Sequence, residues 1–222
     1  MRTDVVLLPG MHGSTALFEG LIASAPRWAR CRAIPLPLIA DQSFEALAMA
    51  IEPQVRELES FVLFAESFSA PIGARLARRL GSKVSLLVLC SPLIELPWAF
   101  APSLASWLIR RRWTPRWSVA LALTGGDGDL ASAVLREVWA LPEPVLSGRL
   151  AAAFAARRDD GFRDLQAPFL GIAGSKDRLT SPSRTEELVG RVPLAAYAEI
   201  EAPHLAAQVA PHLVWAAFES AA

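Results

Sequence analysis

The sequence predicts an α/β fold with a mostly parallel, doubly wound sheet of about six strands and a helical insertion. Short apolar runs alternate with longer stretches of helical period, which is typical of strands buried on both faces of a parallel sheet. The length of 222 residues corresponds to about one domain. Hydrophobic residues make up 53% of the chain and charged residues 20%, which is typical of globular proteins.

Six apolar runs are the predicted strands, and stretches of helical period separate them. Strands that alternate with helices along a chain favour parallel pairing through helical crossovers. The predicted strands are residues 5–10, 31–37, 61–66, 84–91, 168–174 and 195–201, and the predicted helices are residues 15–26, 43–58, 69–80, 183–190 and 211–220.

Residues 94–164 interrupt this alternation because they contain no strand-like run. They are rich in tryptophan and contain further helical stretches. We therefore expect an α/β core formed by residues 1–93 and 165–222, with residues 94–164 forming a helical cap inserted between two strands.

Charge and composition exclude several classes of function. Twenty-two basic residues balance 22 acidic residues, so no net field attracts nucleic acid or an acidic membrane. No uncharged apolar run approaches the roughly 18 residues of a membrane span, and the first residues lack the apolar core of a secretory signal. Cys31 and Cys90 are too few for a disulfide framework and are expected to be buried. We expect a cytoplasmic enzyme or binding protein.

The end of the third predicted strand carries the first candidate for chemistry. Residues 61–66 are followed by Ser67 and Ser69, and Pro71 lies where a helix is expected to begin. Ligands of open α/β sheets bind at the carboxyl ends of the strands. Ser67 on this strand-turn-helix corner could be a nucleophile, and either serine could instead cap the helix. This segment alone leaves both interpretations open.

A serine nucleophile needs an imidazole base, and the chain has three histidines. His204 follows the last predicted strand, where its side chain can reach back over the sheet edge. His212 lies in the first turn of the final predicted helix, where a solvated position is expected. His12 lies in the loop after the first strand, where we expect it to shape the loop.

The imidazole also needs a carboxylate that orients it. Asp177 follows the fifth predicted strand, and Glu95 after the fourth is a weaker substitute. Asp177 could also be a turn residue or pair with Arg178. The order Ser67, Asp177, His204, each just past a strand, is the order expected of a hydrolase on this type of sheet.

Two backbone N–H groups would complete such a site by binding the oxyanion. The residue after the nucleophile, Phe68, supplies one of them. The loop LLPGMHGS after the first strand has glycines at positions 10 and 13, which allow the N–H of Met11 to supply the second. Without Ser67 nearby, the same loop could be an ordinary turn.

Four motifs, LLPGMHGS, AESFS, SKDRLTSP and APHL, resemble those of the α/β-hydrolase family over nearly the whole chain. Within it, the chain is similar to small bacterial carboxylesterases that resemble pimeloyl-carrier-protein methyl ester esterase. The resemblance implies a Ser67-His204-Asp177 triad that acts on a small-molecule acyl ester without a cofactor or metal. An acyltransferase or thioesterase would share the triad. A non-catalytic ligand-binding member of the fold usually lacks one of its residues.

The chain departs from the family at the nucleophile, where the usual pattern is G-x-S-x-G. Ala65 and Ser69 replace both glycines. The family uses small residues because strand and helix pack tightly there, and Ala and Ser add only one or two heavy atoms. We therefore expect the turn to persist, with Ser69 able to crowd the site or donate a hydrogen bond to it.

The segment WLIRRRWTPRW, residues 107–117, interleaves arginines with tryptophans. It could bind an acidic acyl-carrier protein or a substrate carboxylate through charge-assisted hydrogen bonds. The same pattern also describes an amphipathic helix with a solvated face. The residues that bind substrate are not identified by any spacing rule.

Overall fold

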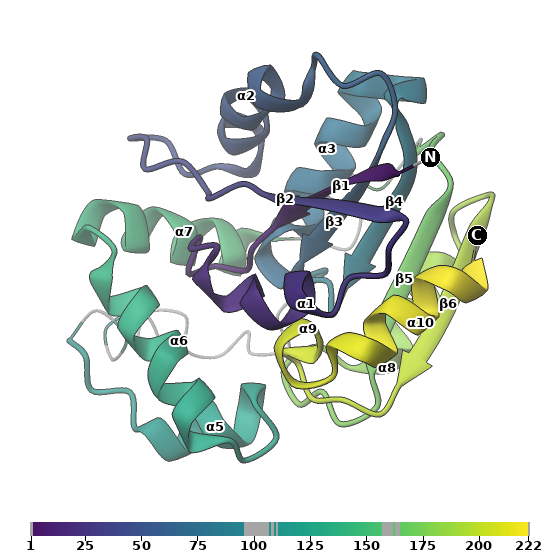
Figure 1. The fold of residues 1–222 in the computed structure, drawn as a ribbon. Coiled ribbons are helices and arrows are strands. Elements are labelled where there is room, and N and C mark those ends of the chain that lie inside the picture. The colour runs from purple at the N-terminus through teal and green to yellow at the C-terminus, as the bar shows by residue number, and fades with distance from the viewer. Residues whose placement is uncertain are drawn as a thin grey trace.

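The computed structural model describes residues 2–95, 111–156 and 165–221, together with residues 107, 109 and 162. Within these ranges six strands form one sheet in the order β2-β1-β3-β4-β5-β6, and every pairing is parallel (Figure 1). The predicted fold class is thereby confirmed. The strands are β1 (Thr3–Leu8), β2 (Ala29–Ala33), β3 (Phe61–Glu66), β4 (Val84–Cys90), β5 (Phe169–Gly174) and β6 (Ala195–Ile200).

The helices of the sheet region follow the prediction with small shifts of their ends. The α-helices are α1 (Glu19–Ala23), α2 (Phe44–Val55), α3 (Ala70–Leu80), α8 (Pro182–Val189), α9 (Ala206–Val209) and α10 (Pro211–Ala221). The described residues also form three short 3-10 helices, labelled η1 (Ala16–Phe18), η2 (Ser67–Ser69) and η3 (Gly81–Lys83). The four-residue α9 was not predicted because it is too short to show a helical period. None of the helices in the described ranges is long and apolar enough to cross a membrane.

Both faces of the sheet are covered, which explains why the central strands read as continuous apolar runs. In β3, Phe61, Leu63 and Ala65 pack on the side of α2, α3 and α8. The alternate residues Val62 and Phe64 pack on the opposite side, against α1, α9 and α10. Figure 1 shows α1 and α10 in front of the sheet. Since every residue of β3 is buried, its carboxyl end is held firmly at the sheet edge.

The two outer strands are less buried than the central ones. In β2 and β6 no residue is fully buried. Cys31 in β2 is therefore only partly buried, which corrects the expectation that both cysteines are buried; Cys90 in β4 is fully buried. Both thiols are free.

The strand order places the loops after β1 and β3 side by side. The direction of winding reverses between these strands, since β2 lies on one side of β1 and β3 on the other. Leu8, the last residue of β1, pairs with Ala65 of β3. The Pro9–Gly10 turn and Ser67 therefore leave the sheet at the same edge, which is where ligands of such sheets bind.

Between β4 and β5, the described residues 111–156 form the helices α5 (Arg116–Leu123), α6 (Gly128–Ala140) and α7 (Glu143–Ala155). They share an apolar cluster that Leu205 joins from the sheet region, with Met11 and Leu17 packed against it. Part of the predicted cap, including Trp98, lies outside the described residues. The division into core and cap stays a prediction.

Close packing between β3 and α3 explains the alanine before the nucleophile corner. A Cβ atom added to Gly73 of α3 would lie 2.8 Å from the Cβ atom of Ala65 and 3.3 Å from Leu87 Cδ1. There is room for one methyl group between strand and helix, and Ala65 supplies it. Gly73 in the helix leaves the space that this methyl group fills.

We expect Gly73→Ala to lower the free energy of unfolding by about 1–2 kcal/mol. Overpacking costs about 1–3 kcal/mol, and the better helix propensity of alanine returns up to about 1 kcal/mol. The double variant Ala65→Gly/Gly73→Ala moves the methyl group across the interface and should recover most of the loss in urea unfolding.

Gly20→Ala is the matched control, because a Cβ atom at this position of α1 meets no atom within 4 Å. It should leave the free energy of unfolding unchanged or slightly higher. A double variant no more stable than Gly73→Ala alone would contradict the packing argument.

Candidate active site

Three side chains from three separate loops form a continuous chain of hydrogen bonds. Ser67 Oγ lies 2.8 Å from His204 Nε2, and His204 Nδ1 lies 2.8 Å from Asp177 Oδ2. His204 is 2% exposed and its ring is enclosed by the loops. The three residues that follow β3, β5 and β6 are thus brought together as the sequence predicted. We call them the Ser-His-Asp chain.

Ser67 occupies a strained corner between β3 and α3. Its φ angle is +48°, a left-handed conformation that is uncommon for residues with a Cβ atom. The carbonyl of Ser67 accepts hydrogen bonds from the N–H groups of Ala70 and Leu93, which hold the corner. The hydroxyl is thereby presented toward His204 beside the N-terminus of a helix, the arrangement of a sharp nucleophile turn.

Neither serine hydroxyl caps the helix, which resolves the alternative that the sequence left open. Ser69 occupies the position before α3, but its side chain makes no capping hydrogen bond. Its hydroxyl instead donates to the carbonyl oxygen of Pro9 in the loop after β1. Ser69 is fully buried and ties that loop to the nucleophile corner; the sequence suggested that Ser69 could donate a hydrogen bond, but not that Pro9 would accept it.

Asp177 has a hydrogen-bond donor at each position that a carboxylate can offer. Its Oδ1 atom accepts from the N–H groups of Leu179 and Thr180, both at 2.8 Å. Its Oδ2 atom accepts from the Thr180 hydroxyl at 2.7 Å and from His204. Thr180 was not predicted, although the spacing Asp-x-x-Thr in SKDRLTSP is the pattern of such a turn.

This environment keeps Asp177 ionised. Burial acts to raise the pKa of Asp177, but the hydrogen bond and charge of His204 and the donors of Thr180 outweigh it and hold the pKa below its ordinary value. A carboxylate beside Nδ1 fixes the imidazole so that Nε2 faces Ser67. The proton of Ser67 therefore has an acceptor within hydrogen-bonding distance.

Gly174 allows the loops of Asp177 and His204 to approach each other. A Cβ atom at this last residue of β5 would lie 2.4 Å from the carbonyl oxygen of Ala202 and 2.6 Å from that of Pro203. The N–H of Lys176 also donates to the Ala202 carbonyl at 3.0 Å. These backbone contacts set the separation of the two side chains.

The loop after β1 is fixed from several sides. The N–H of Gly10 donates to Glu66 Oε2 at 3.2 Å, and the N–H of Gly13 donates to the Gly10 carbonyl at 2.9 Å. Because Ser69 donates to the Pro9 carbonyl, both turn residues before Met11, Pro9 and Gly10, have a hydrogen-bond partner. Among the described residues, the N–H of Met11 donates to no acceptor. The N–H of Phe68 lies in the first turn after β3, where N–H groups lack helical partners.

His12 and Glu66 are buried next to each other behind this loop. His12 Nδ1 accepts the N–H of Ser14 at 3.2 Å, in agreement with the predicted loop-shaping role. Burial lowers the pKa of His12 to about 4, so its ring is neutral at pH 7. Its Nε2 atom lies 4.0 Å from Glu66 Oε2. Glu66 was not predicted, although a carboxyl group in an otherwise apolar strand is a signal for a buried polar contact.

The remaining candidate residues lie away from the Ser-His-Asp chain. His212 is exposed on α10, as expected. Glu95 Oε2 lies 3.9 Å from Arg184, and Asp177 occupies the Nδ1 side of His204. In the described part of the chain, no group of three or more histidine, cysteine, aspartate or glutamate side chains could hold a metal ion.

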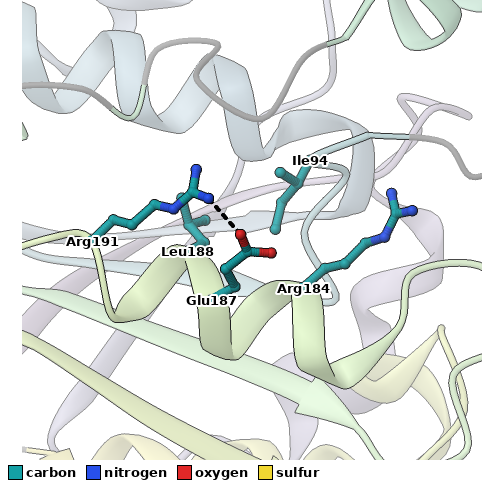
Figure 2. Close-up of a pocket in the computed structure, with 5 residues that line it drawn as sticks. All are labelled: Ile94, Arg184, Glu187, Leu188 and Arg191. Carbon is teal, nitrogen blue, oxygen red and sulfur yellow. Dashed lines mark hydrogen bonds and ion pairs between the residues drawn. The ribbon is translucent and has the colours of Figure 1, made fainter.

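A small pocket beside α8 is lined by none of the residues of the Ser-His-Asp chain. Figure 2 shows its lining residues, with Glu187 paired to Arg191 along one helical turn. Arg184 donates to the Glu95 carbonyl at 2.7 Å. The charged side chains that line the pocket therefore have partners within the protein. The pocket is lined by Ile94, Arg184, Glu187, Leu188 and Arg191.

Glu66 makes the stability of the protein depend on pH. Burial raises the pKa of this fully buried carboxyl, so folding favours its neutral form. That contribution is present below the unfolded pKa of about 4.3 and is lost as pH rises through the higher folded pKa. Relative to Glu66→Gln, the wild-type protein should lose free energy of unfolding as the pH rises above about 4.3, measured by urea unfolding.

Glu57→Gln is the control for this titration, because Glu57 is exposed. Its stability curve should run parallel to that of the wild type. Parallel curves for Glu66→Gln and wild type would show instead that Glu66 titrates alike in the folded and unfolded chains.

Comparison with known proteins identifies the fold. No family model matches the chain, and no curated protein sequence matches it. Solved structures that are similar include a thermophilic esterase from Thermogutta terrifontis (16% identity, TM-score 0.83, 99% of this chain and 89% of that one). A hydrolase from Oleispira antarctica has 14% identity and a TM-score of 0.84, and the match covers 99% of this chain and 90% of that one. The enol-lactonase from Burkholderia xenovorans LB400 has 15% identity and a TM-score of 0.77, and the match covers 99% of this chain and 92% of that one.

Identities this low bear on the fold alone. The closer likeness to pimeloyl-carrier-protein methyl ester esterase stays a prediction. The six-stranded parallel sheet, its flanking helices and these whole-chain similarities show that the protein has the α/β-hydrolase fold.

Proposed function

We propose that this protein is a serine hydrolase that cleaves carboxylic esters of small or medium acyl substrates through an acyl-enzyme. The observation that carries the proposal is the unbroken chain of hydrogen bonds from Ser67 through His204 to Asp177. An ordinary serine hydroxyl is a weak nucleophile, and this arrangement provides the base and the orienting carboxylate that activate it. The esterase and lactonase among the similar structures support the same class of reaction.

In the proposed mechanism, Ser67 Oγ attacks the ester carbonyl carbon while His204 Nε2 takes its proton. The resulting tetrahedral oxyanion is held by the N–H groups of Met11 and Phe68. His204 then gives the proton to the leaving alkoxide, and the alcohol departs from the acyl-enzyme. Water repeats the two steps, with His204 again as base and acid, and releases the carboxylic acid.

The free N–H of Met11 supports its assignment to the oxyanion hole. The loop is anchored through Glu66 and Ser69, so the donor does not need to reorganise when charge develops on the substrate. Losing one such donor typically lowers the rate about 100-fold to 1,000-fold. A loss of this size gives a reason for two buried polar side chains, Glu66 and Ser69, to hold the Pro9–Gly10 turn.

The acyl group that we propose is apolar. Met11 and Leu205, one at the proposed oxyanion loop and one directly after His204, both contact the apolar cluster of the helices between β4 and β5. Two residues next to the proposed catalytic groups thus belong to an apolar cluster, which supports an apolar acyl group. We also propose an acyl-carrier protein as a partner, because arginines are concentrated in residues 107–117. In the same segment, Trp113 and Trp117 are 63% and 70% exposed.

A fluorophosphonate probe should label Ser67 in the purified wild-type protein, because such probes react with activated serines whatever the natural substrate is. Ser67→Ala should abolish both labelling and hydrolysis of p-nitrophenyl esters. Peptide mapping by mass spectrometry locates the label. Ser183→Ala, which removes an exposed hydroxyl on α8, should behave like the wild type. Full esterase activity in Ser67→Ala would overturn the proposal.

Asp177→Asn should lower kcat by about 10⁴-fold with the fold intact. An amide can accept on one side only, so its NH₂ group must face either the N–H donors of Leu179 and Thr180 or the Nδ1 of His204, and the imidazole loses its productive tautomer. Steady-state kinetics with p-nitrophenyl butyrate measures the effect.

Asp127→Asn is a matched control, because the Asp127 carboxylate also accepts two backbone N–H groups, at the start of α6. It should cost some stability and little activity. Equal kcat values for the two asparagine variants would remove Asp177 from the mechanism.

A further inference from the structure

Arg149 of α7 is a buried cation without an acidic partner. Its side chain has no exposed surface, and burial lowers its pKa to about 10, which leaves it charged at pH 7. Within the described residues, no carboxylate lies within 4.0 Å of its guanidinium. A buried, unpaired charge is unfavourable, so its position calls for a reason.

Among the residues that the structure describes, the guanidinium donates only to neutral oxygen atoms, and these belong to two loops, one after β1 and one after β2. Its Nη1 group donates to the Met11 carbonyl at 2.9 Å, and its Nε group donates to Gln42 Oε1 at 2.8 Å. Its Nη2 group donates to the carbonyls of Leu36 and Pro37 at 3.2 and 3.3 Å. One side chain from α7 therefore joins the loop after β1 to the loop after β2.

Gly13 makes this contact possible. A Cβ atom at Gly13 would lie 2.2 Å from Arg149 Nη1, and the φ angle of Gly13 is +72°. The Gly13 carbonyl also accepts the N–H of Leu36 at 2.9 Å. The second glycine of the loop thus makes space for the arginine, whereas the sequence suggested only that it lets the backbone turn.

The arginine contacts the residue that carries a proposed oxyanion donor. The peptide plane before Met11 is held through the Gly10 carbonyl, which accepts from Gly13. The peptide plane after Met11 is held by Arg149 through the Met11 carbonyl. With both planes fixed, the direction of the Met11 N–H is fixed, and the unpaired positive charge of Arg149 lies next to the carbonyl of the same residue.

We propose that Arg149 is a positioning residue that fixes the Met11 N–H and places a buried positive charge near the developing oxyanion. This inference rests on the proposed hydrolase function. Preorganised charge in a water-poor site acts strongly on a developing anion. It also gives the helices between β4 and β5 a direct part in the chemistry of the sheet edge.

The test compares Arg149→Met and Arg149→Lys with the wild type, using kcat for p-nitrophenyl butyrate per serine titrated by the fluorophosphonate. Titration counts only folded, competent sites. We expect Arg149→Met to lower kcat per site by about 10-fold to 100-fold, because it acts on one of two donors. KM should change less than threefold. Arg149→Lys keeps the positive charge but lacks the several N–H donors of the guanidinium, so its kcat per site should lie between those of Arg149→Met and the wild type.

A trifluoromethyl ketone inhibitor, which forms an oxyanion on Ser67, should bind Arg149→Met more weakly by the same factor as kcat falls. A purely structural role would lower stability and the number of titrated sites without moving either quantity. Arg136→Met removes an exposed arginine of α6 and should keep both at wild-type values.

A second pair of variants keeps the test decisive where Arg149→Met does not fold. Gln42→Glu and Gln42→Leu both remove the amide donors to Pro37 and Ile39, but only the glutamate adds a carboxylate beside Arg149 Nε. The glutamate neutralises the buried charge. We expect its kcat per site to be about tenfold below that of the leucine variant.

Two outcomes overturn the inference on its own: wild-type kcat per site in folded Arg149→Met, or equal values in the two Gln42 variants. In both cases the wild-type protein remains an active esterase. A wild-type protein that neither reacts with the probe nor cleaves the ester would overturn the proposed function and this inference together.

Discussion

The hydrogen bond between His204 and Asp177 is the contact on which the candidate site depends. It holds the imidazole with Nε2 toward Ser67, and it keeps a buried carboxylate ionised. It forms because the two loops touch through their backbones at Gly174, where no side chain could fit. The geometry of the side chains is therefore set by the close approach of main-chain atoms.

The parallel sheet imposes the other constraint. Ser67, Asp177 and His204 are far apart in sequence, and they meet because every parallel strand ends at the same edge. The site carries unfavourable local features, such as the positive φ angle of Ser67 and the buried carboxyl of Glu66. The fully buried strands β3 and β5 offset them, since they hold the corner residues in place.

Sequence reasoning predicted the fold and the three members of the Ser-His-Asp chain because both follow from local signals. Apolar runs mark buried strands, and polar residues directly after them mark the ligand-binding edge. Contacts between distant loops leave no such signal. The bond from Ser69 to Pro9 and the position of Arg149 depend on which loops become neighbours, and no spacing rule predicts that. The sequence suggested that Ser69 replaces a glycine and could donate a hydrogen bond, but it did not identify Pro9 as the acceptor.

The position of β6 at the edge of the sheet has a consequence for local stability. Within the part of the chain that the structure describes, β6 pairs only with β5, and none of its residues is fully buried, whereas β1, β3 and β4 pair on both sides. Strands of this kind open at lower free energy than the centre of a sheet. Opening of β6 would carry His204 away while Ser67 remained on an intact corner. Amide hydrogens of β6 would then exchange ahead of those of β3, and a gently warmed molecule would lose its base before it lost its core.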